Sequence, residues 1–178
     1  KSKGVQVTSD VSPHHIGLNE NHLNEFNSFY KFTSPLRSDD DIHALIKGLR
    51  DGVIDCIASD HSPCRIEDKE ADLLNAASDS IGLESAFSYS NEILSSNGFH
   101  IEDILKLFTT KPNSIVNLNW SPLKINEEID LIIINPDIKW KFEKKDIFSK
   151  SKNSALLGKS MKGKVQMIVH KNNIFQIS

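Results

Sequence analysis

Cysteine, excess positive charge and long apolar segments are all scarce in this sequence. Its 178 residues include only two cysteines, Cys56 and Cys64, too few for a disulfide-stabilised framework and typical of a reducing cytosol. The net charge of −3 provides no basic surface for a nucleic acid. The longest apolar run, Leu131–Ile134, is far shorter than the roughly 20 residues of a membrane span. We therefore expect a cytoplasmic protein without nucleic-acid or membrane partners.

The chain is also short for one common enzyme fold. Apolar residues make up 38% and charged residues 25% of it, a composition typical of a folded globular protein. A closed (β/α)8 barrel usually needs about 200–250 residues or more, so this chain holds at most part of one. It opens with Lys1–Gly4, without an initiator methionine or a signal peptide. We expect it to be either processed or cut from a longer protein.

The first 118 residues alternate between strand-like and helix-like patterns. Strands are predicted over 5–11, rich in β-branched residues, and over Val53–Ala58, whose nearly continuous apolar run is typical of a parallel strand buried on both faces. Ser38, the aspartates that follow it and apolar residues at helical spacing predict a helix that ends at 51–52. Further helices are expected over 83–94, 101–108 and 112–118. This order predicts an α/β fold.

The pattern changes after residue 118. Short strands joined by turns are expected over 129–134, 139–142, 165–169 and 173–177. The change from helical to alternating patterns suggests a boundary near residue 118. We therefore divide the chain into a β/α segment, 1–118, and a small β-rich segment, 119–178.

Asp60 is the sharpest candidate for chemistry. The apolar strand delivers it to the strand's C-terminal end, where α/β proteins build their sites. A carboxylate at this place can bind zinc and transfer a proton. Taken alone, however, an Asp60-His61 pair is more typical of an ordinary turn, in which the aspartate caps the turn and the histidine is a loop residue.

Two further groups near the strand ends are candidates for supporting roles. His14 and His15 are adjacent, and neighbouring side chains on an extended chain point to opposite sides. We therefore expect a structural role for them rather than joint binding of one metal. Cys64 lacks a nucleophile signature, and by itself it is typical of a small buried residue, although it lies close enough in sequence to Asp60 to line the same pocket. Cys56 is expected in the core.

Several segments together resemble dihydroorotases, which are cyclic amidohydrolases. The motifs that carry the resemblance occur here in the same order: Val11–His15, Ser34–Ser38, Gly48–His61, Ile81–Phe87, Phe148–Ser154 and, after Gly158, Lys162–Val165. The resemblance covers nearly the whole chain. The late Ser-Lys-Asn-Ser segment favours the dihydroorotase branch over allantoinases.

The resemblance implies a fold and a reaction. The chain would be the C-terminal part of a metal-dependent (β/α)8 TIM-type barrel, followed by the C-terminal strands of a small β domain. The reaction would be the reversible zinc-dependent hydrolysis of dihydroorotate to N-carbamoyl-aspartate in pyrimidine biosynthesis. Asp60 would approach the metal, take a proton from the attacking water and pass one to the leaving nitrogen. His61 and His14 would support this site without touching the metal.

The sequence also departs from the family at the pocket. Most of the zinc ligands in the proteins it resembles lie upstream of this chain. At the substrate-binding positions Thr33 replaces an asparagine, Cys64 replaces a histidine, and Ser78-Asp79 replace a Phe-Gly pair. An aspartate at the last position brings a negative charge towards an anionic substrate. We therefore expect this chain alone to be inactive and to bind zinc weakly.

Two alternatives follow from these departures. The protein could be allantoinase-like or another cyclic amidase, for which Cys64 is the main support. It could also be an inactive dihydroorotase-like homologue that binds a partner, such as the scaffolding subunits of aspartate transcarbamoylase. A homo-oligomer is a further expectation, because an incomplete barrel would expose strand edges and apolar helix faces.

Overall fold

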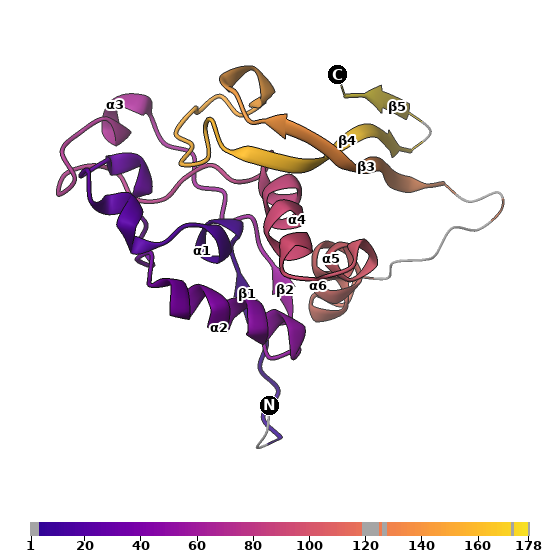
Figure 1. Cartoon of the computed structure of the whole chain (residues 1–178). Helices are drawn as coiled ribbons and strands as arrows, with labels where there is room; N and C mark the ends of the chain where they lie inside the picture. Colours follow the sequence, from indigo (N-terminus) through magenta and orange to yellow (C-terminus); the bar gives the residue numbers. More distant parts are fainter. Residues whose placement is uncertain (1–3, 119–124, 126–127, 172, 178) are drawn as a thin grey trace.

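The computed structural model describes residues 4–118, 125, 128–171 and 173–177. Helices α1 to α6 and a parallel strand pair form one side of the molecule, and an antiparallel sheet lies against α4 on the other (Figure 1). Across the described ranges, no helix combines the length and apolarity needed to span a bilayer. The predicted α/β class is confirmed.

The parallel pair consists of β1 (Asp10–Val11) and β2 (Cys56–Ile57). Both strands are shorter than predicted. Val5 and Val53 are exposed at 59% and 60%, since the pairing begins only beyond them. The apolar run 53–58 is therefore buried only at its centre, and the prediction of burial on both faces along its whole length is wrong.

Helix α2 (Asp39–Arg50) forms where the sequence predicts it. The Ser38 hydroxyl accepts a hydrogen bond from the Asp41 amide at 3.3 Å, and the Asp41 carboxylate accepts one from the Ser38 amide. This reciprocal capping satisfies amides that have no partner inside the helix. Ile46 and Leu49 bury the apolar face, while the acidic first turn stays at the surface.

The remaining helices frame the parallel pair. Their bounds are α1 (Pro13–Gly17), α3 (Ile66–Lys69), α4 (Ala86–Ser96), α5 (Ile101–Phe108) and α6 (Thr110–Ile115), with short 3-10 helices at Glu20–Leu23, Ser28–Tyr30 and Lys144–Asp146. The predictions of α4, α5 and α6 are confirmed, with shifts at their ends. His14 and His15 lie on α1 rather than on extended chain, because Pro13 starts a helical turn directly after β1.

The C-terminal part forms an antiparallel sheet in the order β3 (Asp130–Lys141), β4 (Ser160–His170) and β5 (Asn173–Gln176). Two predicted strands, 129–134 and 139–142, are one long strand. The β3–β4 register shifts twice, between Ile133 and Ile134 and between Asn135 and Lys139. These irregularities let one strand continue through residues 135–138, which carry the turn-like signal Asn-Pro-Asp.

Two apolar clusters hold the molecule together. One lies between α2, α4, α5 and the parallel pair. The other joins side chains from before and after residue 118, namely Leu18, Phe32, Leu36, Ile81, Tyr89, Phe142, Ile147, Ala155, Leu156 and Met161. The β-rich part therefore shares a core with the first part. The division into 1–118 and 119–178 remains a prediction, and residues 119–124 lie outside the described part.

Candidate functional site

Asp60 lies beyond the C-terminal end of β2, as predicted. Its backbone is left-handed, with φ at +48°, and its side chain is exposed. Ala58 still hydrogen-bonds to the neighbouring strand, since its amide donates to the carbonyl of Val11 at 3.1 Å. The chain thus leaves the sheet just before Asp60 and turns there.

A pocket of about 360 Å³ adjoins this carboxylate. Asp10 and Ser12 line it from β1 and its end, and Ala58 and Asp60 line it from the corresponding part of β2. Val11 lines it as well, so the pocket is formed by the chain around the ends of both strands. The predicted place of Asp60 at the C-terminal end of a parallel strand agrees with the structure, and its role as a catalytic and metal-binding residue stays a prediction.

His15 borders the same pocket, a placement that sequence reasoning missed. Its Nε2 lies 2.8 Å from the carbonyl oxygen of Ser34, and its Nδ1 lies 2.7 Å from the hydroxyl of Ser12. A carbonyl only accepts, so Nε2 carries the proton and Nδ1 accepts from Ser12. His15 therefore joins the end of β1 to the segment at residue 34. The sequence reasoning placed His15 on extended chain, and its position on helix α1 was the information that it lacked.

His14, the residue before His15, is fully buried. Its ring lies 5.0 Å from the ring of Phe32, centroid to centroid. Burial away from solvent, reinforced by the neighbouring His15, lowers the pKa of His14 to about 4. Neither ring nitrogen has a hydrogen-bond partner of ordinary geometry among the described residues. His14 is thus a neutral packing residue, and the supporting role at the site stays a prediction.

His61 connects the end of β2 to the Gly-Leu-Glu segment. The amides of Gly82 and Leu83 both point at its Nδ1, at 3.3 and 3.2 Å. Both amides are donors, so Nδ1 is the unprotonated nitrogen. His61 also forms a parallel bridge with Ser80. His61 therefore ties the two segments together, and its supporting role at the site stays a prediction.

Thr33 and Asp79, two of the positions predicted to bind substrate, bind each other. The Thr33 amide donates to one carboxylate oxygen of Asp79 at 2.8 Å, and the Thr33 hydroxyl donates to the other at 2.7 Å. Asp79 is left-handed, with φ at +68°. Sequence reasoning proposed both positions but not their pairing, because they lie 46 residues apart.

Cys64 and Ser78 lie elsewhere. Cys64 lines a larger, open cavity of about 970 Å³ rather than the pocket of Asp60, which corrects the idea that the two share one pocket. The turn at Asp60 leads the chain away, and Asn153 holds the Cys64 amide at 3.4 Å. Burial raises the pKa of the Cys64 thiol, which favours the unreactive protonated form. Ser78 is half-buried and lines neither cavity.

The metal-binding capacity of this part of the chain is small. Nowhere in the described ranges do three His, Cys, Asp or Glu side chains gather as a metal site would require. A catalytic zinc needs about three protein ligands besides water. Asp60 offers one carboxylate, so the described residues do not by themselves fit a catalytic zinc.

Comparison with curated proteins decides the relationship. The chain is 40% identical over 177 residues to dihydroorotase of Caldicellulosiruptor saccharolyticus, and the match covers 99% of the chain and 41% of that protein. It is 38% identical over 165 residues to dihydroorotase of Ehrlichia chaffeensis, covering 93% of the chain and 37% of the relative. The chain is a homologue of dihydroorotases over nearly its entire length.

This dihydroorotase homologue spans about two fifths of the length of the curated relatives it matches. No family model matches it. Its fold is similar to that of L-hydantoinase (dihydropyrimidinase) from Arthrobacter aurescens, with a TM-score of 0.87 and 22% identity over 97% of this chain and 40% of that one. It is also similar to the inactive dihydroorotase-like domain of a Chaetomium thermophilum multifunctional protein, with a TM-score of 0.68, 18% identity and coverage of 97% and 44%.

Proposed function

We propose that this chain is the C-terminal part of a dihydroorotase-like cyclic amidohydrolase. It would supply the last two parallel strands of a (β/α)8 barrel, β1 and β2, and the closing strands of a small β domain. The identity of 40% to a curated dihydroorotase supports this. The observation that carries it is the place of Asp60, at a pocket mouth beyond the C-terminal end of a parallel strand.

The proposed reaction opens a cyclic amide, dihydroorotate, to N-carbamoyl-aspartate. Water adds its oxygen to the ring carbonyl carbon, the bond from that carbon to the ring nitrogen breaks, and the nitrogen gains a proton. Asp60 would accept a proton from the water and return it to the leaving nitrogen. General acid–base catalysis of this kind contributes about 10²–10⁴-fold. Asp60 is exposed to the pocket, so it can reach both water and substrate.

The other described residues would shape this pocket. His15 and its partners Ser12 and Ser34 make a hydrogen-bonded wall beside Asp60. Zinc is the metal we propose for the complete protein, with Asp60 as one ligand and the others supplied mostly by residues outside this chain. A cytoplasmic location accompanies this proposal, since the pathway's substrate is a small soluble metabolite.

The test is Asp60→Asn in the complete protein, with Asp10→Asn as the matched control. Both carboxylates line the same pocket, but only Asp60 is assigned the proton transfer. We expect ring opening of dihydroorotate to fall at least 100-fold in D60N and to stay within a few-fold in D10N. Equal activity of D60N and the parent protein would overturn the proposal.

Two alternatives are favoured by particular observations. Cys64 stands where the dihydroorotases it resembles commonly have a histidine, so an allantoinase-like or other cyclic amidase is the second candidate; turnover of allantoin, hydantoin or dihydrouracil in place of dihydroorotate would favour it. The fold similarity to an inactive dihydroorotase-like domain suggests a partner-binding homologue instead. Co-elution with aspartate transcarbamoylase, or self-association, without any turnover would favour that role.

A further inference from the structure

Lys69 is a fully buried lysine that the proposed reaction does not use. It ends helix α3 and exposes none of its surface. Its ammonium donates to three backbone carbonyls, those of Lys31 at 3.2 Å, Ala77 at 2.9 Å and Asp79 at 2.7 Å. None of its hydrogen bonds within the described residues goes to a carboxylate. Burial lowers the pKa of Lys69.

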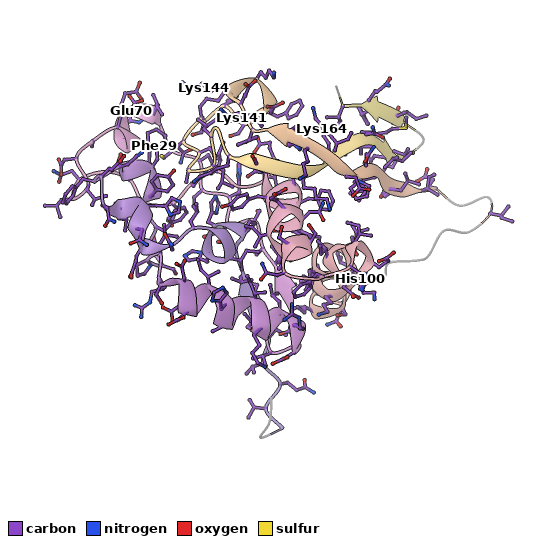
Figure 2. All side chains as sticks on the ribbon, viewed as in Figure 1. Phe29, Glu70, His100, Lys141, Lys144 and Lys164 are labelled. Atoms are coloured by element: carbon purple, nitrogen blue, oxygen red, sulfur yellow. The ribbon has the colours of Figure 1, made fainter. Side chains whose placement is uncertain are left out.

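These bonds tie two separate segments to α3. Lys31 belongs to the segment that follows the 3-10 helix at 28–30, and Ala77 and Asp79 belong to the loop before the Gly-Leu-Glu segment. The Asp79 amide donates to the same Lys31 carbonyl at 2.8 Å, and the Ser28 hydroxyl donates to the Lys69 carbonyl at 2.6 Å. Phe29 and Glu70, the chain neighbours of Ser28 and Lys69, lie in the same corner of the molecule (Figure 2). The ammonium is therefore the centre of a three-segment junction.

The junction leads directly to the rim of the pocket. Lys69 holds the carbonyl of Asp79 while the Asp79 carboxylate holds the amide and hydroxyl of Thr33. The next residue, Ser34, lines the pocket of Asp60 and binds His15 through its carbonyl. A left-handed backbone at a non-glycine residue such as Asp79 persists where surrounding contacts hold it. Lys69 supplies such a contact.

Packing alone does not explain a lysine here. Burying an ammonium without a carboxylate is costly, and an apolar side chain of similar length would fill the space. Lys31 provides a contrast on the same loop, because its ammonium reaches the carbonyls of Leu74 and Ala76 at 2.9 and 2.8 Å from a half-buried position. Among the described residues, the hydrogen bonds of its ammonium go to that loop and to neither Asp79 nor Thr33, although its backbone carbonyl accepts from the Asp79 amide.

We propose that Lys69 is a positioning residue, whose ammonium sets the turn at residues 77–79 and thereby places the Asp79–Thr33 pair at the rim of the Asp60 pocket. Its relevance to catalysis rests on the proposed function. Its effect on the Asp79–Thr33 pair does not depend on the proposed function, so the structural effect and the catalytic effect are tested separately.

The structural test is hydrogen exchange of the Thr33 amide in the complete protein, followed by mass spectrometry of peptides across residues 31–34. Lys69→Met keeps the length and volume of the side chain but removes the three donors, and Lys31→Met is the control. Loss of one hydrogen bond corresponds to about a tenfold change. We expect exchange at Thr33 to quicken about tenfold in K69M and to stay within twofold of the parent in K31M.

The functional test is steady-state kinetics on dihydroorotate with the same variants and with Thr33→Val. We expect K69M to raise KM about tenfold while kcat falls less than threefold, and the K69M/T33V double variant to be no worse than the more affected single variant. Additive losses would overturn the proposal, since Lys69 would then act independently of Thr33. A lower melting temperature with unchanged exchange at Thr33 would also overturn it, leaving a packing role.

Failure of the proposed function has a different signature. If D60N retains turnover, the assignment of the active site is wrong, but the exchange result at Thr33 still decides what Lys69 does. If D60N is inactive and Thr33 exchanges alike in K69M and K31M, the reaction assignment stands and the role of Lys69 is refuted.

Discussion

Gly82 of the Gly-Leu-Glu segment lies against the backbone that carries Asp60. Substitution of Gly82 therefore tests directly whether this contact positions Asp60. A Cβ atom added to Gly82 would lie 2.2 Å from the carbonyl oxygen of Ser59 and 3.0 Å from the His14 ring. Ser59 immediately precedes Asp60. A side chain at residue 82 would therefore push on the backbone between β2 and Asp60.

The size of the effect follows from these distances. Contacts of a Cβ atom below 3.0 Å are essentially never found, so the backbone at Gly82 or at Ser59 must move by about 0.8 Å. The atom in the way belongs to the backbone, so no rotamer change relieves the clash. Overpacking of this kind costs about 1–3 kcal/mol of stability, and a displacement of roughly 1 Å at a catalytic group costs about 100-fold in rate.

The assay compares Gly82→Ala with Gly52→Ala in the complete protein. A Cβ at Gly52 meets nothing within 4 Å, and its φ of +70° makes alanine there strained but not crowded. We expect both variants to lose about 1 kcal/mol or more in urea unfolding. Only G82A should also lose about 100-fold in dihydroorotate turnover.

The outcome that refutes this reasoning is specific. If G82A turns over within threefold of G52A at equal folded fraction, the backbone at Ser59 does not control the position of Asp60. If G82A does not fold, the parent protein is titrated with mild urea, and turnover and folded fraction are measured at each concentration. Turnover that falls before the folded fraction does separates loss of the site from loss of the fold.

Three further predictions concern stability. Phe142→Ala should lower the free energy of unfolding by about 3–5 kcal/mol, because Phe142 is 1% exposed in the core shared by both parts of the chain, whereas Phe148→Ala, at 80% exposure, should cost little; equal losses would contradict the shared core. The pKa of His14 is lowered to about 4, below its value near 6.5 in the unfolded chain, so the free energy of unfolding should fall by roughly 3 kcal/mol as the pH drops from 7 to 4. His14→Leu should reduce this dependence of stability on pH, and an unchanged dependence would show that other groups cause it. Ser38→Ala should cost about 1 kcal/mol in thermal unfolding by removing the cap of α2, and no change would mean that Asp41 caps the helix without it.

Local signals explain why part of the fold was predictable from the sequence. Helices α2 and α5 form where it predicts them, since the cap at Ser38, the acidic first turns and the apolar spacing all act within a few residues. The position of Asp60 could also be predicted from the sequence, because the apolar run of the strand stops just before it and so marks the strand's C-terminal end. Strand lengths did not follow, since they depend on pairing with distant residues, as the exposed Val5 and Val53 show.

Sequence by itself therefore determined helices α2, α4, α5 and α6, the strand that delivers Asp60 and the resemblance that names a reaction, but not helices α1 and α3. Only the tertiary structure decided the pairing of Thr33 with Asp79 and the burial of Lys69 under three carbonyls. The partners in these contacts lie up to 46 residues apart, and neither a threonine nor a lysine carries a local signal of such a partner. Their pairing depends on how loops close in three dimensions, where each buried donor must find an acceptor.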